Sequence, residues 1–373
     1  MPWKQVSIME QRQEFVALAR TEGANVSELC RRYDISRDTA YRWLGREDCA
    51  GRSTRPHNSP SRTAAEMEAC VLEVRDAHPA WGARKIRQIL LNQGLIPPAP
   101  STVQAILERH GRIADTDRQR RRFERFEKPE PNLLWQMDFK GQFKMGNDNW
   151  CWPLTIVDDH SRYALDIQGC SNQTTQTVKS LLENTFRRYG LPTAFYVDNG
   201  SPWGGNEPGQ YTPLRVWLLR LGVRVIHATP YHPQGRGKNE RFHRTLRREV
   251  LEANLPMDMR HAQAAFDSWR HAYNHVRPHQ SLDMKPPISR YRPSNRPMPD
   301  TLPDIVYDSS EIVRKVPKGL PKFSFKGKDW RVPKAFQGEH LALRPTGKDG
   351  EYDVCFGAIP IRTIDLNAAQ SSQ

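Results

Sequence analysis

Three carboxylates occur in contexts that suit the binding of divalent metal ions. Asp138 lies in the alternating segment 135–145, Asp198 ends the apolar run 194–198, and Glu240 follows a turn rich in glycine and proline. Oxygen ligands of this kind suit Mg²⁺ or Mn²⁺. Two such ions can activate an attacking oxygen and stabilise a leaving one during in-line phosphoryl transfer. We therefore predict one site that holds two ions through Asp138, Asp198 and Glu240.

Two of these carboxylates are positioned by strands. Apolar and polar residues alternate from Trp135, so Asp138 lies on the polar face of a strand. The polar face also carries Gln136 and Lys140, and the apolar face carries Trp135, Met137, Phe139, Phe143 and Met145. Asp198 is at the carboxyl end of a second, buried strand, because Asn199 and Gly200 form a turn after it. Such strand ends are where open α/β sheets place ligand sites.

A helix positions the third carboxylate. Phe242, Leu246 and Val250 recur at i, i+4 and i+8 and predict a buried helical stripe. At about 100° per residue, Glu240 lies about 200° from Phe242 and points away from that stripe. A pair with an arginine is the simpler alternative to a metal ion, and the candidates are Arg236, Arg244 and Arg247.

The motifs around these carboxylates resemble those of a known family. They are Met137-Asp138-Phe139, Val197-Asp198-Asn199-Gly200-Ser201 and the run 230–241. They resemble the catalytic core of retroviral integrases and of the bacterial insertion-sequence transposases that share an Asp, Asp, Glu triad. The resemblance implies a ribonuclease-H-like α/β core, two metal ions, and cleavage and joining of DNA strands.

The spacing departs from that family in one place. Asp198 and Glu240 are 240 − 198 = 42 positions apart, and the segment 203–210 looks like a small insertion. Glu207 in this insertion is an alternative third ligand. We prefer Glu240, because Glu207 lies among glycine and proline residues that predict no helix or strand to fix its position.

The composition indicates a polyanionic partner. The 373 residues include 56 Lys and Arg against 42 Asp and Glu, a net charge of +14, which favours DNA over an acidic protein or a neutral small molecule. The six cysteines form no Cys-x-x-Cys pair, so neither a zinc ribbon nor a disulfide framework is predicted. No apolar run approaches ~20 residues, so no membrane span is predicted. We expect a cytoplasmic bacterial protein that associates with the nucleoid when bound to DNA.

Two helix-turn-helix DNA-binding domains are predicted before the core. Residues 1–50 contain three short helical segments, with Ser36 as the N-cap of the third. Residues 60–111 repeat the pattern, with Ser101 as the N-cap of the third helix. A small three-helix bundle with an ordinary charged face is the alternative for the first domain. Two modules on one chain would bind long terminal inverted repeats through effective concentration.

The remaining segments connect and follow the core. Residues 112–132 predict a basic linker, for which a solvated helix with Glu and Arg pairs is the alternative. Residues 285–303 are rich in proline and predict an extended linker. Short alternating stretches with glycine turns in 304–366 predict a small SH3-like β-barrel. By resemblance this barrel binds DNA or joins subunits, and a stabilising end domain is the alternative.

Residues 133–288 are predicted to form the core. The expected order is three strands, helix, strand, helix, strand, helix, with a further helix at 260–274. For Asp158 and Asp159, turn-capping and pairing with Arg162 are preferred to a metal role. Four histidines are predicted to lie at the surface or face DNA and to hold no zinc: His261, His271, His275 and His279.

These features together predict a DNA transposase. It would bind the terminal inverted repeats of its insertion sequence and catalyse metal-dependent strand cleavage and strand transfer into target DNA, as a dimer or higher homo-oligomer. A catalytically inactive DNA-binding regulator derived from such an enzyme is the alternative, against which the presence of all three carboxylates argues. The predicted DNA contacts are Arg37, Tyr41, Arg42, Arg84, Lys85, Ser101, Thr102, Gln104, Arg120, Arg121, Arg122, Tyr231, Gln234, Lys238, Arg244 and Arg247.

Overall fold

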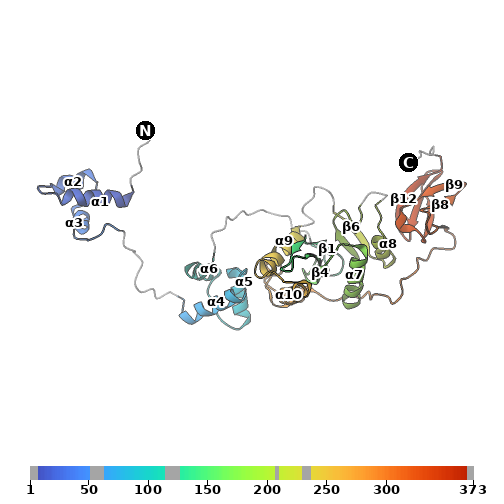
Figure 1. Cartoon of the computed structure of the whole chain (residues 1–373), viewed down its shortest axis with the longest axis horizontal. Coiled ribbons are helices and arrows are strands. Elements are labelled where there is room, and N and C mark those ends of the chain that lie inside the picture. The colour runs from blue at the N-terminus through green and yellow to red at the C-terminus, as the bar shows by residue number, and fades with distance from the viewer. Residues whose placement is uncertain (1–6, 51–62, 114–126, 206–209, 229–236, 368–373) are drawn as a thin grey trace. The chain divides into compact units, whose positions relative to one another are not determined.

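The chain divides into two compact units, Met1–Thr63 and Ala64–Gln373. Helices make up the described part of the first unit, and the second contains helical, α/β and all-β parts in that order (Figure 1). The computed structural model describes residues 7–50, 63–113, 127–205, 210–228 and 237–367.

The first unit consists of three capped helices. They are α1 (Ile8–Ala19), α2 (Val26–Arg32) and α3 (Arg37–Leu44). The side chains of Ser7, Asn25 and Ser36 accept hydrogen bonds from backbone N–H groups of the first turns, each cap contributing about 1 kcal/mol. The buried core consists of Phe15, Val16, Cys30 and Ala40. The prediction of Ser36 as an N-cap is confirmed.

Three further helices open the second unit. They are α4 (Ala65–Ala77), α5 (Ala83–Asn92) and α6 (Pro100–Arg109). Their core includes Val71, Trp81, Ile86, Leu90, Val103, Ile106 and Leu107. The prediction of Ser101 as an N-cap is wrong, because α6 already begins at Pro100, with Ala99 before it and no side-chain cap. Proline suits this first position because its φ is already helical and its missing N–H would be unpaired there.

The α/β part contains a six-stranded mixed sheet. The strands are β1 (Trp135–Phe139), β2 (Phe143–Lys144), β3 (Trp150–Asp158), β4 (Ala164–Cys170), β5 (Ala194–Val197) and β6 (Arg224–His227). Their order is β2-β3-β1-β5-β6, and β4 also pairs with β3. The pairs of β3 with β1, β2 and β4 are antiparallel, whereas β1, β5 and β6 run parallel.

Four helices accompany this sheet in the predicted order. They are α7 (Thr175–Tyr189), α8 (Pro213–Arg220), α9 (Gly237–Leu246) and α10 (Met259–His271). Helices α9 and α10 continue into π-helical turns, η2 (Arg247–Leu251) and η3 (Ala272–Val276). The 3₁₀ turns η4 (Gln280–Leu282) and η5 (Pro287–Arg290) follow. The order of strands and helices in the core is as predicted, except that the predicted first strand is divided into β1 and β2, so four strands precede α7.

The sheet is buried by two separate apolar clusters. One joins Trp135 and Met137 of β1 to residues of α7 and α8. The other joins Val157 of β3 and Ile167 of β4 to residues of α9 and α10. Because alternate residues of a strand face opposite sides, these clusters lie on the two faces of the sheet.

One prediction about the first strand is wrong in part. Phe143 and Met145 belong to the cluster under α9 and α10, not to the cluster that contains Trp135. The strand is interrupted after Phe139, and Gly141 has a φ of +90°, so the alternation does not continue across the break. Of the residues on the predicted polar face, Gln136 is buried, whereas Asp138 and Lys140 are partly exposed.

The last part of the chain contains two small antiparallel sheets. One has the order β12-β11-β10-β7, and the other pairs β8 with β9. The strands are β7 (Ile312–Lys315), β8 (Lys322–Phe325), β9 (Lys328–Arg331), β10 (His340–Pro345), β11 (Glu351–Phe356) and β12 (Ile359–Asp365), with the 3₁₀ turn η6 (Lys334–Phe336). In the described residues, the strands form two sheets rather than one closed ladder, so the SH3-like barrel is not confirmed. Val216 and Leu219 of α8 belong to the same apolar cluster as these strands.

Candidate active site

The strand register brings Asp138 and Asp198 to corresponding positions. β1 and β5 are neighbouring parallel strands in which Trp135 pairs with Phe195, an offset of 195 − 135 = 60 residues. Asp138 and Asp198 have the same offset, 198 − 138 = 60. The residues before them, Met137 and Val197, pack against α7 and α8. Because successive residues of a strand point to opposite faces, Asp138 and Asp198 both lie on the other face of the sheet. The two carboxylates are thus at the same end of adjacent strands.

Glu240 lies in the first turn of the helix that packs on this face. Phe242 and Leu246 of α9 and Val250 of η2 are buried in the cluster shared with β3 and β4, which confirms the predicted apolar stripe. Glu240 itself is exposed, as expected for a residue that points away from that stripe.

His243 is a residue of α9 that lies beside Asp138. Its Nδ1 is 4.0 Å from Asp138 Oδ2, and its Nε2 is 2.8 Å from Thr155 Oγ1 on β3. Burial and the nearby charge of Lys140 lower the pKa of His243 to about 4, so the ring is neutral at pH 7. His243 was not predicted as a site residue from the sequence. Its position three residues after Glu240, which places both on neighbouring parts of one helix face, could have identified it.

The backbone around Asp198 is held by the neighbouring strand. His227 Nδ1 lies 3.0 Å from the Asp198 carbonyl, and the Asn199 amide donates to the Ala228 carbonyl at 3.0 Å. Burial lowers the pKa of His227, so a neutral ring donates its Nδ1 proton to the carbonyl. These contacts fix the end of β5, where Asp198 begins the following turn.

The three carboxylates fit a divalent ion by their chemistry. Carboxylate oxygens are the ligands that Mg²⁺ and Mn²⁺ prefer. Among the described residues, however, no group of three His, Cys, Asp or Glu side chains is placed so that it could hold a metal ion. Glu240 therefore does not complete a site with Asp138 and Asp198 in this conformation, and the three-residue site stays a prediction.

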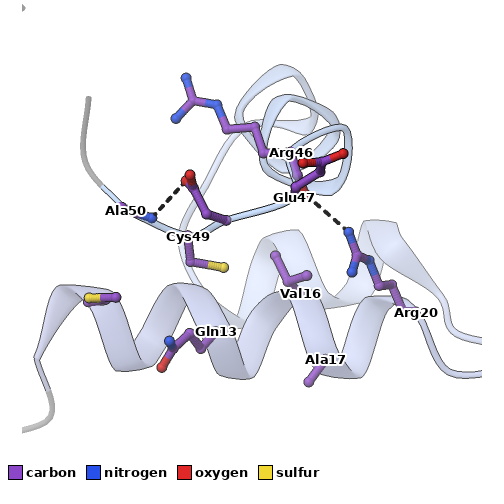
Figure 2. A pocket seen from close by; sticks show the side chains of 10 residues that line it. Gln13, Val16, Ala17, Arg20, Arg46, Glu47, Cys49 and Ala50 are labelled. Carbon is purple, nitrogen blue, oxygen red and sulfur yellow. Dashed lines mark hydrogen bonds between the residues drawn. The ribbon is translucent and has the colours of Figure 1, made fainter. Parts of the chain in front are cut away.

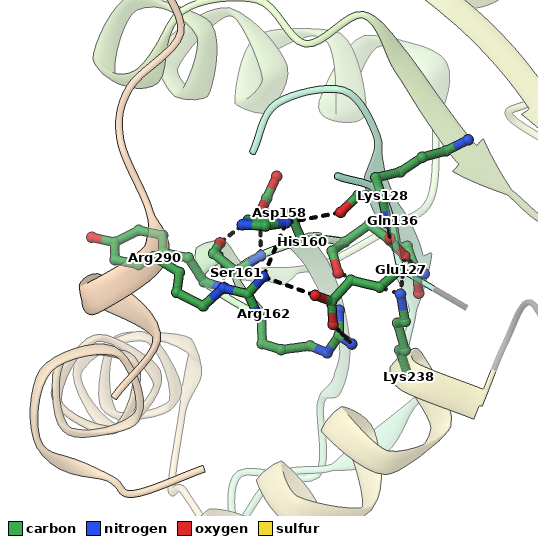
Figure 3. A network of polar contacts seen from close by, with 11 residues as sticks. Glu127, Lys128, Gln136, Asp158, His160, Ser161, Arg162, Lys238 and Arg290 are labelled. Atoms are coloured by element: carbon green, nitrogen blue, oxygen red, sulfur yellow. Dashed lines mark hydrogen bonds and ion pairs between the residues drawn. The ribbon is translucent and has the colours of Figure 1, made fainter. Parts of the chain in front are cut away.

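A buried polar network lies at the end of β3 (Figure 3). Asp158 accepts hydrogen bonds from the backbone N–H and the hydroxyl of Ser161, at 2.8 and 2.6 Å, and from the backbone N–H of Asn132 at 2.8 Å. Burial raises the pKa of Asp158 despite these bonds. Its turn-capping role is as predicted.

The neighbouring Asp159 has a different set of partners. It accepts from Gln136 Nε2 and from the backbone N–H of Lys128, both at 2.8 Å, and pairs with Lys238 Nζ at 2.5 Å. The predicted Asp–Arg pair at this position is wrong, because Arg162 pairs with Glu127 at 2.8 Å. The sequence could not show that the first turn of α9 would supply a closer cation.

Lys238 therefore has a role inside the protein. It was predicted to contact DNA, but its ammonium lies on the fully buried Asp159. Burial lowers the pKa of Lys238. The ion pair attaches the first turn of α9 to the end of β3, two residues before Glu240.

The other predicted DNA contacts differ in accessibility. The exposed ones are Arg37, Tyr41, Arg42, Arg84, Ser101, Arg244 and Arg247. Lys85, Thr102 and Gln104 are half-buried, and burial lowers the pKa of Lys85 to about 8. Arg247 also pairs with Glu252 at 3.0 Å. Five predicted contacts and the alternative ligand Glu207 lie outside the described residues: Arg120, Arg121, Arg122, Tyr231 and Gln234.

One of the four histidines departs from the prediction. His261, His271 and His275 are exposed, whereas His279 is buried. Its Nε2 lies 3.3 Å from the guanidinium of Arg277. Burial and this cation lower the pKa of His279 to about 2. The surface prediction is wrong for this residue because the chain after η3 folds back under Tyr273, whose ring is in edge-on contact with that of His279.

Two hollows lie away from the predicted carboxylates. One, of about 400 Å³, lies in the first unit between α1 and the segment that follows α3 (Figure 2). There Arg20 donates hydrogen bonds to the carbonyls of Leu44 and Arg46. The other, of about 330 Å³, is lined by residues of 281–290. Neither contains Asp138, Asp198 or Glu240.

Family models match along the chain. The matches are a helix-turn-helix domain at 11–58, a homeodomain-like domain at 39–107, integrase core domains at 128–233 and 221–287, and the C-terminal domain of the IS481 family of transposases at 311–372. The two integrase matches cover the sheet, α9 and α10.

Two curated relatives come from insertion elements. An insertion element IS476 protein of Xanthomonas euvesicatoria is 26% identical over 61% of this chain and 65% of its own length. An insertion element IS407 protein of Burkholderia multivorans is 28% identical over 42% of this chain and 54% of its own. The chain belongs to the insertion-sequence transposases with an integrase-like core. It spans less than two thirds of the length of these two relatives.

Solved integrases are more distant from this transposase. The simian T-cell lymphotropic virus intasome, in complex with a PP2A regulatory subunit, matches 79% of this chain and 99% of its own at 18% identity and a TM-score of 0.38. The catalytic core of HTLV-2 integrase in complex with magnesium matches 44% of this chain and 99% of its own at 18% identity and a TM-score of 0.33. The assignment of residues 128–287 to an integrase core therefore relies on the family models.

None of the helices described for this transposase is both long and apolar enough to cross a membrane.

Proposed function

We propose that this chain cleaves and joins DNA strands at the ends of its insertion sequence, with Asp138, Asp198 and Glu240 as the catalytic carboxylates. The observation that carries the proposal is the shared register of Asp138 and Asp198 on adjacent parallel strands, on the sheet face against which α9 packs. Family membership supports phosphoryl transfer to and from DNA as the reaction class.

The roles of the residues follow from their positions. Asp138 and Asp198 are fixed by the sheet and would hold two Mg²⁺ or Mn²⁺ ions, and Glu240 would close the site from the first turn of α9. When bound, such ions supply charge that activates the attacking oxygen and stabilises the leaving oxygen. The exposed Arg244 lies one turn after Glu240 and would hold a DNA phosphate so that the reacting ends are aligned.

Recognition of the element ends is assigned to the two helical modules. In the first, residues 1–50, the exposed Arg37, Tyr41 and Arg42 of α3 would contact DNA in a groove. In the second module, which spans residues 60–111, DNA would be contacted by Arg84 and the first turn of α6. The segment 112–132 would link them to the core at 133–288. The β part at 304–366 is proposed as a small barrel that binds DNA or joins subunits in a homo-oligomer.

Joining of a labelled oligonucleotide that carries one element end tests this proposal. Asp138→Asn and Asp198→Asn should each abolish joining in Mg²⁺ or Mn²⁺ while leaving end binding nearly intact, because the amide keeps the shape but loses the charge. Asp148→Asn is the matched control, since Asp148 is an exposed carboxylate paired with Lys144 away from these strand ends. Full joining by either of the first two variants would contradict the proposal.

A further inference from the structure

The turn that begins at Asp198 is packed against β1. We call residues 198–205 the Asp198 turn. It is closed by two backbone hydrogen bonds between glycines, each of 2.7 Å. Within it the side chain of Trp203 is buried, and its ring centroid lies 5.9 Å from that of Phe139, the last residue of β1. A shift of this turn would therefore move Asp198 relative to the neighbouring strand.

The start of α8 holds the second half of the Asp198 turn. Arg215 Nη1 donates a hydrogen bond of 2.7 Å to the backbone carbonyl of Gly205. The hydroxyl of Thr212, the N-cap residue of α8, donates one of 3.4 Å to the carbonyl of Trp203. Because hydrogen bonds weaken steeply when their atoms move, the position of α8 restricts the position of the turn.

A row of aromatic contacts connects Arg215 to the last part of the chain. Its guanidinium carbon lies 3.9 Å from the centroid of the Tyr211 ring, a distance at which the cation is attracted to the ring face. The Tyr211 ring in turn contacts Phe336, with the two centroids 5.0 Å apart. Phe336 is fully buried in the apolar cluster of residues 304–366, which we call the β part. The β part is thus linked to the Asp198 turn by three successive side chains.

Helix α8 is packed by apolar residues on two sides. Trp217 and Leu218 belong to the cluster that buries one face of the core sheet. Val216 and Leu219 belong to the cluster of the β part. Displacement of α8 would expose apolar area on both sides, so the β part helps to hold this helix in place.

We propose that the β part positions the Asp198 turn for strand joining, through Phe336, Tyr211 and Arg215. The inference rests on the proposed function, because it assumes that Asp198 takes part in joining. Tyr211 and Arg215 are then positioning residues, which act on the reaction through the backbone of the turn. The β part gains a role within one chain, beyond the binding of DNA or of another subunit proposed above.

The competing explanation is that the β part uses α8 only as a docking surface. Loss of the Arg215 contacts would then lower stability, as would loss of any other contact between α8 and the β part, without changing joining per folded molecule. Arg220 of the same helix allows the comparison. Its partners are Asp304 at 2.8 Å and Glu339 at 3.6 Å, both in the β part.

Single-turnover strand joining by the full-length protein, at saturating labelled end oligonucleotide, separates these explanations. The Kd for the same oligonucleotide and the stability in urea are measured in parallel, and rates are expressed per folded molecule. Arg215→Met and Tyr211→Leu should join at least about 10-fold more slowly with an unchanged Kd, because a displacement of about 1 Å at a reacting group can cost that much or more. Phe336→Leu, which stays apolar but loses the ring, should also join more slowly. Tyr211→Phe keeps the ring and should join at the unmodified rate, as should the matched control Arg220→Met.

Three results would overturn the inference. They are an unmodified joining rate in folded Arg215→Met and Tyr211→Leu, an equal loss of joining in Arg220→Met, and an unmodified rate in folded Phe336→Leu. Asp198→Asn, measured beside them, distinguishes the inference from the proposed function. If Asp198→Asn abolishes joining while Arg215→Met joins normally, the positioning role is wrong and the proposed function stands. If Asp198→Asn joins fully, the proposed function is wrong, and the inference fails with it.

Discussion

The two faces of the core sheet are packed by different kinds of contact. On one face, α7 and α8 enclose an apolar cluster that includes Trp135, Phe186 and Phe195. On the other face, α9 is attached by apolar residues and also by two polar contacts with β3 and its end, from Lys238 to Asp159 and from His243 to Thr155. The first kind of packing is found under ordinary supporting helices, and the second under the helix that carries Glu240.

This difference shows how one helix can be placed more exactly than another. Burial of apolar area is non-directional, so it favours contact without fixing a single register. A hydrogen bond or buried ion pair weakens steeply when its atoms move, and an unpaired buried group is costly. Lys238 and His243 lie on either side of Glu240 in sequence, so their contacts restrict both the position and the rotation of its helix turn. The catalytic role proposed for Glu240 would need that restriction.

The largest loss of stability is expected from a substitution on the sheet face covered by α7 and α8. Phe186→Ala should lower the free energy of unfolding by about 3 to 5 kcal/mol, because the ring is fully buried against Trp135, Phe195 and Trp217. Urea denaturation measures this. Strand joining per folded molecule should change little, since no polar contact of α9 is touched. A loss of joining without a loss of stability would contradict the comparison.

A substitution on the sheet face covered by α9 is expected to cause a smaller loss of stability and a larger loss of strand joining. Lys238→Met should lower the free energy of unfolding by about 3 kcal/mol, because it leaves the buried Asp159 without its cation. Joining per folded molecule should fall as well, because the first turn of α9 is released.

Two further variants check the effect of Lys238→Met. Adding Asp159→Asn to Lys238→Met should recover most of the stability, since no buried charge then remains. Lys179→Met is the matched control, because Lys179 pairs with Glu183 on α7 at 3.9 Å and at the surface. Equal loss of joining in Lys179→Met would show that the position of the lysine is irrelevant.

The smallest of the three effects depends on pH. The pKa of His279 is lowered to about 2, below its usual 6.5, so the unfolded chain takes up a proton below pH 6.5 that the folded chain does not. Stability is therefore lost as the pH falls below 6.5. Between pH 6.5 and pH 5 this costs about 2 kcal/mol, which His279→Gln should remove. Identical pH profiles for the two proteins would contradict the burial of a neutral His279 beside Arg277.

Sequence periodicity was sufficient to predict which residues of the core helices and strands are apolar and buried. The stripe of Phe242, Leu246 and Val250 depends on a local pattern, and the structure has it. The order of strands and helices also follows local patterns, and it differs from the prediction only in the division of the first strand into β1 and β2. The pattern failed where Gly141 interrupts it, which placed Phe143 on the other face. A pattern of residue types does not show where the chain changes direction.

The polar contacts could not be predicted in the same way. Thr155 and His243 are 88 residues apart, and Asp159 and Lys238 are 79 apart, so no local pattern connects them. Gln136 was predicted on a polar face, and it is buried because its amide donates to Asp159. A buried polar residue can be recognised only when its partner is known, and the fold supplies the partner.

Strand joining by Glu240→Gln, compared with Glu252→Gln and Glu207→Gln, tests the central claim most directly. The claim is that Glu240, on a helix held to the sheet by Lys238 and His243, acts together with Asp138 and Asp198 in strand joining. Glu252 is the matched control, because it follows the same helix and pairs with Arg247 at the surface. We expect that Glu240→Gln binds the element end but does not join it, while the other two variants join normally. Robust joining by Glu240→Gln, or its loss in Glu207→Gln, would contradict the assignment.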